Sequence, residues 1–161
     1  MIAATLICLV IGIGDGDSLT VRCGAGHVHQ PMRVRIAAID APERGQPYSQ
    51  QSRKMLAALC HRQMARITVS TTDHYGRAVA DVQCRGQDAG RHMVRNGMAW
   101  VYTRYAHAHA YLRPLQQTAQ AQRLGLWQAT GSNKPPVPPW VWRARQAAYR
   151  ERLIPQGLTR L

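Results

Sequence analysis

Acidic residues and lysines are both scarce in this chain. Lys and Arg together number 21 whereas Asp and Glu number only 8, so the formal net charge is +13. Such a field attracts polyanions, and nucleic acid is the first candidate. Lys54 and Lys134 are the only lysines, so arginine carries most of the charge, and its guanidinium pairs with phosphate oxygens in a bidentate way. Composition alone leaves two alternatives open: a basic protein kept soluble by its charge, or one that meets anionic membranes.

Long apolar runs are absent as well. The longest, Leu6–Ile13, has the length of a strand and falls well short of the ~18–20 residues that span a bilayer. We expect no membrane association and a single soluble domain, which 161 residues with 45% apolar content can build around one core. Residues 1–14 resemble the apolar part of a signal peptide but lack its basic leading region. We therefore expect any signal peptide to have been removed and residues 5–13 to form the first strand.

Cysteine pairs with the C-x₂-C spacing of zinc sites are missing. The cysteines present are Cys8, Cys23, Cys60 and Cys84. Their even number favours two disulfides and hence a periplasmic or secreted protein, with four reduced core thiols as the alternative. If a turn centres on residues 15–16, Cys8 lies opposite Cys23 across a strand pair. We predict the pairs Cys8–Cys23 and Cys60–Cys84.

Periodicity outlines the secondary structure. Alternating apolar and polar residues, bounded by glycine and proline, predict strands at 5–13, 18–23, 32–39, 65–70 and 78–84. Helical spacing predicts helices at 49–59, 88–96 and 111–124, the second of them capped by Asp88. Short strands interleaved with about three α-helices favour an α+β fold, namely a small five-stranded Greek-key β-barrel of the OB type.

The C-terminal part differs in composition. Four prolines in residues 131–139 predict a stiff connector, and the tail after it has five arginines against one glutamate. We therefore expect one domain at 5–130, followed by a connector and basic tail at 131–161. The tail is either a surface helix docked through Trp140 and Trp142 or a flexible segment. We expect it to add phosphate contacts without touching the chemistry.

Half of the acidic residues lie in two short segments near the N-terminus. Asp15 and Asp17 belong to the first segment, and Asp40 and Glu43 belong to the second. Carboxylates are unfavourable on a face that binds polyanions unless a cation lies between them and the phosphate. The pattern therefore indicates a divalent metal held by oxygen ligands.

Three segments carry the candidate chemistry: GDGDSLTV at 14–21, RVRIAAIDAPE at 33–43 and DHYGRAVADV at 73–82. Their order, residue types and spacing resemble staphylococcal nuclease and its thermonuclease-like relatives. Two further segments are similar to later parts of that family, MVRNGMAWVY at 93–102 and LRPLQQTAQAQRLGLW at 112–127. The resemblance covers roughly residues 5–127.

This resemblance implies a calcium ion held by oxygens alone. Asp17 and Asp40 match the family's metal-binding aspartates, and the backbone carbonyl of Ala41 matches its third protein ligand. The family usually has threonine at Ala41 and at Ser18. Because a main-chain ligand does not depend on the side chain, we expect metal binding to survive this difference. Asp15 is expected to form the turn or to support the ligands.

The resemblance also implies the catalytic residues. Glu43 matches the group that activates water, and Arg35 and Arg77 match the pair that meets the charge developing on the phosphoryl oxygens. The implied activity is a calcium-dependent nuclease that breaks the bond to the 5′ oxygen and leaves a 3′-phosphate.

Tyrosines are expected to hold the bases. Tyr75 matches a family tyrosine beside the bound nucleotide, and Tyr102 or Tyr105 would supply a second ring for stacking. Stacking tolerates any base, so the implied cleavage is broadly non-specific on DNA and RNA. No obligate protein partner is implied.

Other interpretations explain the features one at a time. The first segment could be an ordinary hairpin turn, and Arg35 and Arg77 could be strand-edge charges. His107 and His109 lack a third metal ligand nearby, so we expect a solvated loop there rather than zinc. For the whole chain the main alternative is a non-catalytic OB-fold nucleic-acid-binding module, and a structural protein that only coats DNA is another.

Overall fold

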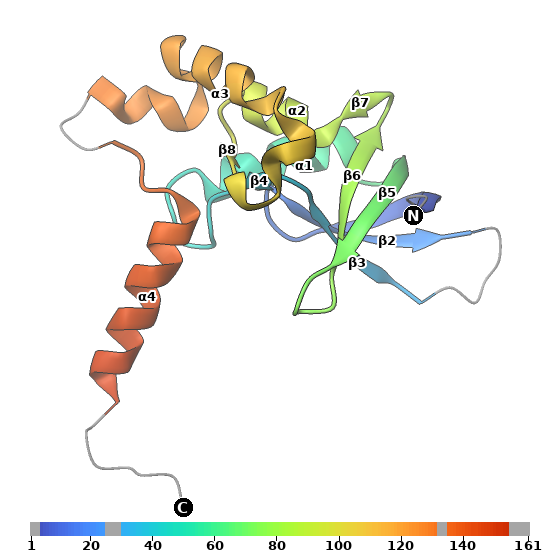
Figure 1. Cartoon of the computed structure of the whole chain (residues 1–161), viewed down its shortest axis with the longest axis horizontal. Coiled ribbons are helices and arrows are strands. Elements are labelled where there is room, and N and C mark those ends of the chain that lie inside the picture. The colour runs from blue at the N-terminus through green and yellow to red at the C-terminus, as the bar shows by residue number, and fades with distance from the viewer. Residues whose placement is uncertain (1–3, 25–29, 132–134, 155–161) are drawn as a thin grey trace, which may run out of the picture.

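The structure is a computed structural model that describes residues 4–24, 30–131 and 135–154. Figure 1 shows a β-barrel with helices gathered on one side of it and a C-terminal helix that projects away from the body. The loop expected at 24–31 lies mostly outside the described residues.

Five strands close into the barrel. They are β1 (Ala4–Ile13), β2 (Ser18–Cys23), β3 (Met32–Ile36), β5 (Met64–Thr72) and β6 (Ala78–Cys84). Neighbours in the order β3-β2-β1-β5-β6 are antiparallel, and a parallel pairing of β3 with β6 closes the sheet. The short β7 (Gln87–Asp88) extends the sheet beyond β6. The predicted α+β fold with an OB-type barrel is confirmed.

The barrel core follows from alternation along the strands. In β1, Cys8 and Val10 are fully buried, whereas Ile7 and Leu9 face outward. Buried aliphatic side chains of the other strands complete the core: Leu19, Val21, Val34, Ile36, Ile67 and Val82. Side chains fill the interior of a barrel this small, so polar functional groups gather at its end rather than inside it.

The predicted strand at 32–39 is wrong in its second half. β3 ends early, and the chain turns at Ala38, whose φ of 60° lies in the left-handed region. The next residues form β4 (Ile39–Asp40), which pairs with β8 (Trp100–Val101) in a separate antiparallel sheet. Because every residue around this turn is buried, no alternation in the sequence reveals it. The turn takes Asp40 out of the barrel sheet.

Three α-helices accompany the barrel, as predicted: α1 (Ser49–Cys60), α2 (Ala89–Arg95) and α3 (Leu112–Ala121). The side chain of Asp88 caps α2 by accepting from the backbone N–H of Arg91, and Gly97 follows the helix with a φ of 67°. α2 packs against both α1 and α3. Two 3₁₀ helices follow, η1 (Thr103–His109) and η2 (Gly125–Gly131).

A fourth helix, α4 (Pro139–Leu153), forms the described part of the basic tail. The helical form of the tail is therefore the one observed. Among the described residues, no helix is both long and apolar enough to cross a membrane.

Two disulfides fasten the domain. Cys8 and Cys23 lie directly opposite each other on β1 and β2 and are bonded, and Cys60 at the end of α1 is bonded to Cys84 at the end of β6. Both predicted pairings are confirmed. The second bond ties α1 to the barrel wall, so the helix and the sheet cannot separate while it is intact.

Removal of the second bond should weaken the fold without rearranging it. For a loop closed by about 15–25 residues, chain entropy accounts for about 3 kcal/mol per bond. We expect the double variant Cys60→Ala/Cys84→Ala to lose about that much free energy of unfolding in urea, with an unchanged circular dichroism spectrum. Equal stability of the parent and the double variant would contradict this role of the bond. Non-reducing peptide mapping of the parent is the control for the pairing.

Candidate active site

The turn between β1 and β2 presents the first carboxylates. Oδ1 of Asp15 accepts from Oγ of Ser18 at 2.5 Å and from the backbone N–H of Asp17 at 3.3 Å, so Asp15 shapes the turn. Gly16 lies so close to α1 that a Cβ there would come within 1.7 Å of Oγ of Ser52. A side chain at this position would push the turn away from the helix. Asp17 is thereby fixed at the end of the barrel.

Asp17 joins two segments that are distant in the sequence. Its side chain is buried, and Oδ2 accepts from the backbone N–H of Ala41 at 2.7 Å. The same oxygen lies 3.0 Å from Nη1 of Arg35 on β3. This carboxylate therefore connects the β1–β2 turn to the segment that follows β4.

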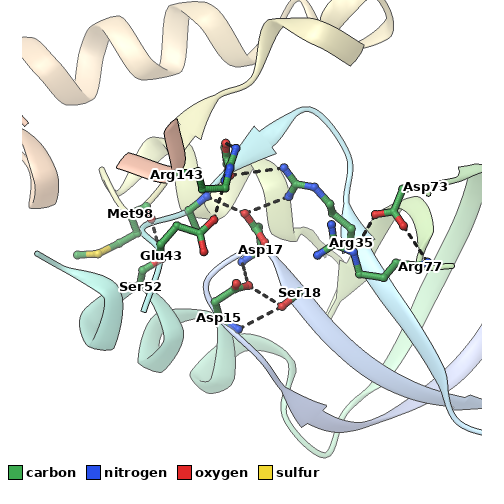
Figure 2. A network of polar contacts seen from close by, with 12 residues as sticks. Asp15, Asp17, Ser18, Arg35, Glu43, Ser52, Asp73, Arg77, Met98 and Arg143 are labelled. Atoms are coloured by element: carbon green, nitrogen blue, oxygen red, sulfur yellow. Dashed lines mark hydrogen bonds and ion pairs between the residues drawn. The ribbon is translucent and has the colours of Figure 1, made fainter. Parts of the chain in front are cut away.

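Arg35 pairs with both Asp17 and Asp40, and Figure 2 shows its guanidinium directed at Asp17. Asp40 is only 1% exposed, and its Oδ1 lies 3.5 Å from Nη2 of Arg35. The turn at Ala38 and the pairing of β4 with β8 bring it here. One guanidinium thus faces two buried carboxylates.

The aspartates hold more negative charge than Arg35 balances. Burial raises the pKa of Asp17 well above its ordinary value, Arg35 opposes the rise, and Asp15 and Asp40 reinforce it. Burial would also raise the pKa of Asp15, but hydrogen bonds from Asp17 and Ser18 outweigh it and the pKa of Asp15 is lowered. A cluster of this kind favours an additional cation.

Glu43 stands at the mouth of the site, on the segment after β4. Its backbone N–H donates to Oε1 of the buried Gln46 at 2.9 Å, and the backbone N–H of Gln46 donates back to the carbonyl of Glu43 at 2.9 Å. These two bonds fix the main chain at Glu43. Its carboxylate stays about one-third exposed, at 34% of the side-chain area.

Asp73 organises the turn between β5 and β6 that carries the second arginine. Its Oδ1 accepts from the backbone N–H of Tyr75 at 2.9 Å and of Arg77 at 3.0 Å, and its Oδ2 accepts from Nε of Arg77 at 2.8 Å. The guanidinium of Arg77 lies 5.5 Å from the centre of the Tyr75 ring. Because β6 starts beside β3, this turn lies at the same end of the barrel as Arg35.

The candidate residues enclose one cavity of about 450 Å³. Tyr75 borders it with an exposed ring, and the ring of Tyr102 lies 5.9 Å from the guanidinium carbon of Arg35. The third predicted tyrosine, Tyr105, has its side chain outside the described part. The other predicted residues that line the cavity are Asp17, Arg35, Asp40, Glu43 and Arg77.

One cavity residue, Arg143 on α4, was not predicted from the sequence. Its Nη2 donates to Oδ2 of Asp40 at 2.7 Å, and its Nη1 donates to Oδ1 of Asp40 at 3.1 Å and to Oε1 of Glu43 at 2.6 Å. The hydrogen bonds to Asp40, then those to Glu43, raise the pKa of Arg143 against the effect of burial. The tail, which we expected only to add phosphate contacts, thus contacts two of the predicted site residues. Nothing in the basic segment around Arg143 distinguishes it from an ordinary surface helix.

Only a limited set of groups could hold a metal here. Among the described residues, no three His, Cys, Asp or Glu side chains are grouped so that they could bind a metal on their own. Two carboxylates, those of Asp17 and Asp40, lie close together, so a cation would need main-chain oxygens and water besides. The carbonyl of Ala41, next to Asp40 in the chain, remains the predicted third ligand.

His107 and His109 are not among the residues that line this cavity. The predicted solvated loop at His107 and His109 is wrong, because both residues belong to η1. Nε2 of His109 lies 2.6 Å from Oδ1 of Asp81 on β6, and the imidazole is largely covered. A 3₁₀ helix of seven residues is too short for its periodicity to be recognised in the sequence.

Comparison with known proteins identifies the family. Residues 33–129 match the family described as staphylococcal nuclease homologues. An uncharacterized endonuclease of Haemophilus influenzae is 37% identical over 139 residues, which cover 86% of this chain and 74% of that protein. A micrococcal nuclease of Shigella flexneri is 36% identical over 83% of this chain and 78% of its own length. Protein ParB of Escherichia coli is 35% identical over 88% of this chain and 81% of its own length.

The family match and the relatives named endonuclease and micrococcal nuclease, together with the OB-type barrel, define a nuclease that acts on nucleic acid. The chain belongs to the staphylococcal nuclease family. Members of this family are in general metal-dependent.

The Asp73–Arg77 contact should make stability depend on pH. Burial alone would raise the pKa of Asp73, but hydrogen bonds from Arg77 and Tyr75 outweigh it and lower the pKa. Such a carboxylate stabilises the fold above its unfolded pKa of about 3.9, and this contribution is lost as the pH falls through the lower folded value. We expect Asp73→Asn to unfold at lower urea than the parent at neutral pH, and the difference to shrink as the pH falls from about 5 to about 2.

The control for this comparison is Glu151→Gln, since Glu151 is exposed on α4. The difference in urea stability between Glu151→Gln and the parent should stay near zero across the same pH range. A loss of stability in Asp73→Asn that is the same at every pH would contradict the assignment and indicate a packing defect instead.

Proposed function

We propose that the chain is a calcium-dependent nuclease of low sequence specificity that hydrolyses phosphodiester bonds in DNA and RNA and leaves 3′-phosphate ends. The observation that carries this proposal is the convergence of Asp17, Asp40, Glu43, Arg35 and Arg77 on one cavity at the end of the barrel. A module that only binds nucleic acid gains nothing from buried carboxylates in its cavity. A hydrolase needs them, because it must hold a cation and activate water.

Asp17 and Asp40, with the carbonyl of Ala41, would hold the cation. The side chains lining the cavity near them are carboxylates and arginines, and oxygen donors without thiolate suit a hard cation such as calcium. Burial raises the pKa of Asp17, and the neighbouring Asp15 and Asp40 carboxylates add to the rise; a bound cation would offset both effects, which supports the same assignment. When bound, the cation supplies Lewis-acid polarisation of a non-bridging phosphate oxygen.

Glu43 would accept the proton of the attacking water. Its carboxylate borders the cavity and is partly exposed, so water reaches it. The backbone bonds to Gln46 fix its position relative to Asp40. A general base that is held in this way typically contributes about 10²–10⁴-fold in rate.

Arg35 and Arg77 would bind the phosphoryl oxygens on which charge develops. Arg35 comes from β3 and Arg77 precedes β6, and the parallel pairing that closes the barrel makes these strands neighbours. Both guanidinium groups are already oriented by carboxylates, Asp17 for the first and Asp73 for the second. Preorganised donors of this kind are typically worth about 3–4 kcal/mol each.

Tyr75 and Tyr102 would stack on the bases that flank the scissile phosphate. The Tyr75 ring is 62% exposed, so a base can reach its face. Stacking does not distinguish one base from another, which supports cleavage of both DNA and RNA without a sequence motif.

Cleavage of the bond to the 5′ oxygen follows from the family resemblance. It leaves 5′-hydroxyl ends, which polynucleotide kinase labels without prior phosphatase treatment. The disulfides further support a periplasmic or secreted enzyme, because such bonds persist in oxidising compartments.

Neutralising Asp40 and Glu43 should have different consequences. Asp40→Asn removes a charged metal ligand, so calcium affinity and cleavage should fall together, and added calcium should restore part of the activity. Glu43→Gln should bind DNA about as well as the parent but cleave it about 10²–10⁴-fold more slowly at every calcium concentration. Single-turnover cleavage and DNA affinity, both measured with calcium, separate the two cases.

Glu151→Gln is the matched control for Glu43→Gln and should cleave at the parent rate. A parent protein that binds DNA but never cuts it, with calcium or without, would establish the binding module instead. Normal cleavage by Glu43→Gln would leave the nuclease in place but remove Glu43 from its mechanism.

A further inference from the structure

Within the described residues, the contacts of the tail helix with the body lie near its N-terminal end. Pro139 is buried, and the ring of Trp140 lies 5.8 Å from that of Tyr102. Every residue from 143 to 154 is exposed, and Figure 1 shows α4 projecting away from the body. A helix attached by so short a stretch can detach without disturbing the barrel.

Gln46 connects this attachment to the catalytic segment. It is only 4% exposed, its Oε1 accepts from the backbone N–H of Glu43, and its Nε2 donates to the carbonyl of Val137 just before α4. One buried amide thus sets both the position of Glu43 and the point from which α4 starts. Arg143 is one turn into the helix and is directed at the carboxylates by this geometry (Figure 2).

The guanidinium of Arg143 engages the oxygens that a metal would need. It bonds both carboxylate oxygens of Asp40 and one oxygen of Glu43, at 2.6–3.1 Å. Its side chain is nevertheless 42% exposed, whereas that of Asp40 is 2% exposed. The buried carboxylate is therefore covered from the solvent side by a group that can withdraw into water.

We propose that Arg143 closes the site as an internal cation, and that a divalent cation must displace it from Asp40 in order to bind. The proposal rests on the function proposed above, in which Asp40 is a metal ligand. A calcium ion needs carboxylate oxygens at about 2.3–2.6 Å, and it repels a guanidinium bonded to the same oxygens. Calcium binding and docking of α4 then oppose each other, and the coupling is reciprocal. Calcium weakens the attachment of α4 to the body, and loss of Arg143 raises the affinity for calcium.

Calcium titration of the full chain by calorimetry tests the reciprocal coupling. Charge-assisted hydrogen bonds of this kind correspond to about a 10- to 100-fold change in an equilibrium constant, so Arg143→Gln should bind calcium about that much more tightly than the parent. Arg145→Gln, an exposed arginine on the same helix, is the matched control and should bind calcium like the parent. Asp40→Asn should lower calcium affinity both alone and combined with Arg143→Gln.

Hydrogen exchange of α4 gives a second readout that does not depend on activity. Calcium should speed amide exchange in residues 140–145 of the parent, whereas in Arg143→Gln exchange there should already be fast without calcium. Equal or weaker calcium binding by Arg143→Gln, with Asp40→Asn still defective, would overturn the closure by Arg143 and leave the proposed function standing. Absence of calcium binding in every variant would overturn both.

Discussion

Two carboxylates buried in a strongly basic protein are the constraint around which this end of the molecule is organised. Asp17 and Asp40 are 4% and 1% exposed, and a buried charge is tolerated only when it is paired and hydrogen-bonded. Asp17 accepts a hydrogen bond from the backbone N–H of Ala41 and forms an ion pair with Arg35. Asp40 forms ion pairs with Arg35 and Arg143. These partners come from separate segments. The carboxylates therefore hold together the turn after β1, the segment after β4 and the tail helix.

The parts of the fold with regular local patterns could be predicted from the sequence. Alternation located the five barrel strands, and the opposition of Cys8 and Cys23 about a single turn gave the first disulfide. Asp88 marked the start of α2 because capping chemistry is local. Most of the predicted site residues come from the three short motifs and line one cavity, together with Tyr102. Ala41 is not among the residues that line it, and the side chain of Tyr105 is not described.

The features that could not be predicted depend on contacts distant in sequence. The turn at Ala38 lies in a fully buried stretch, where neither glycine nor proline marks a break. His109 is held by Asp81, a partner 28 residues away, in a 3₁₀ helix too short for a periodic signal. Arg143 meets Asp40 across 103 residues, and the bond from Gln46 to the carbonyl of Val137 holds the start of its helix near the site. In a chain with many arginines, composition cannot single out the one that turns inward.

Closure of the barrel also determines at which stage of folding the site can form. The two hairpins, β1–β2 and β5–β6, form between neighbours in the sequence, but the β3–β6 pairing joins Val34 to Ala78 and the β4–β8 pairing joins Asp40 to Trp100. Closing such loops costs entropy before any contact repays it, so these pairings come late in folding. The β2–β3 pairing already places Arg35 beside Asp17, but Asp40 and Arg77 join them only through these later pairings. The complete set of charges that lines the cavity therefore comes together only in the closed barrel, and no partly folded chain can present it.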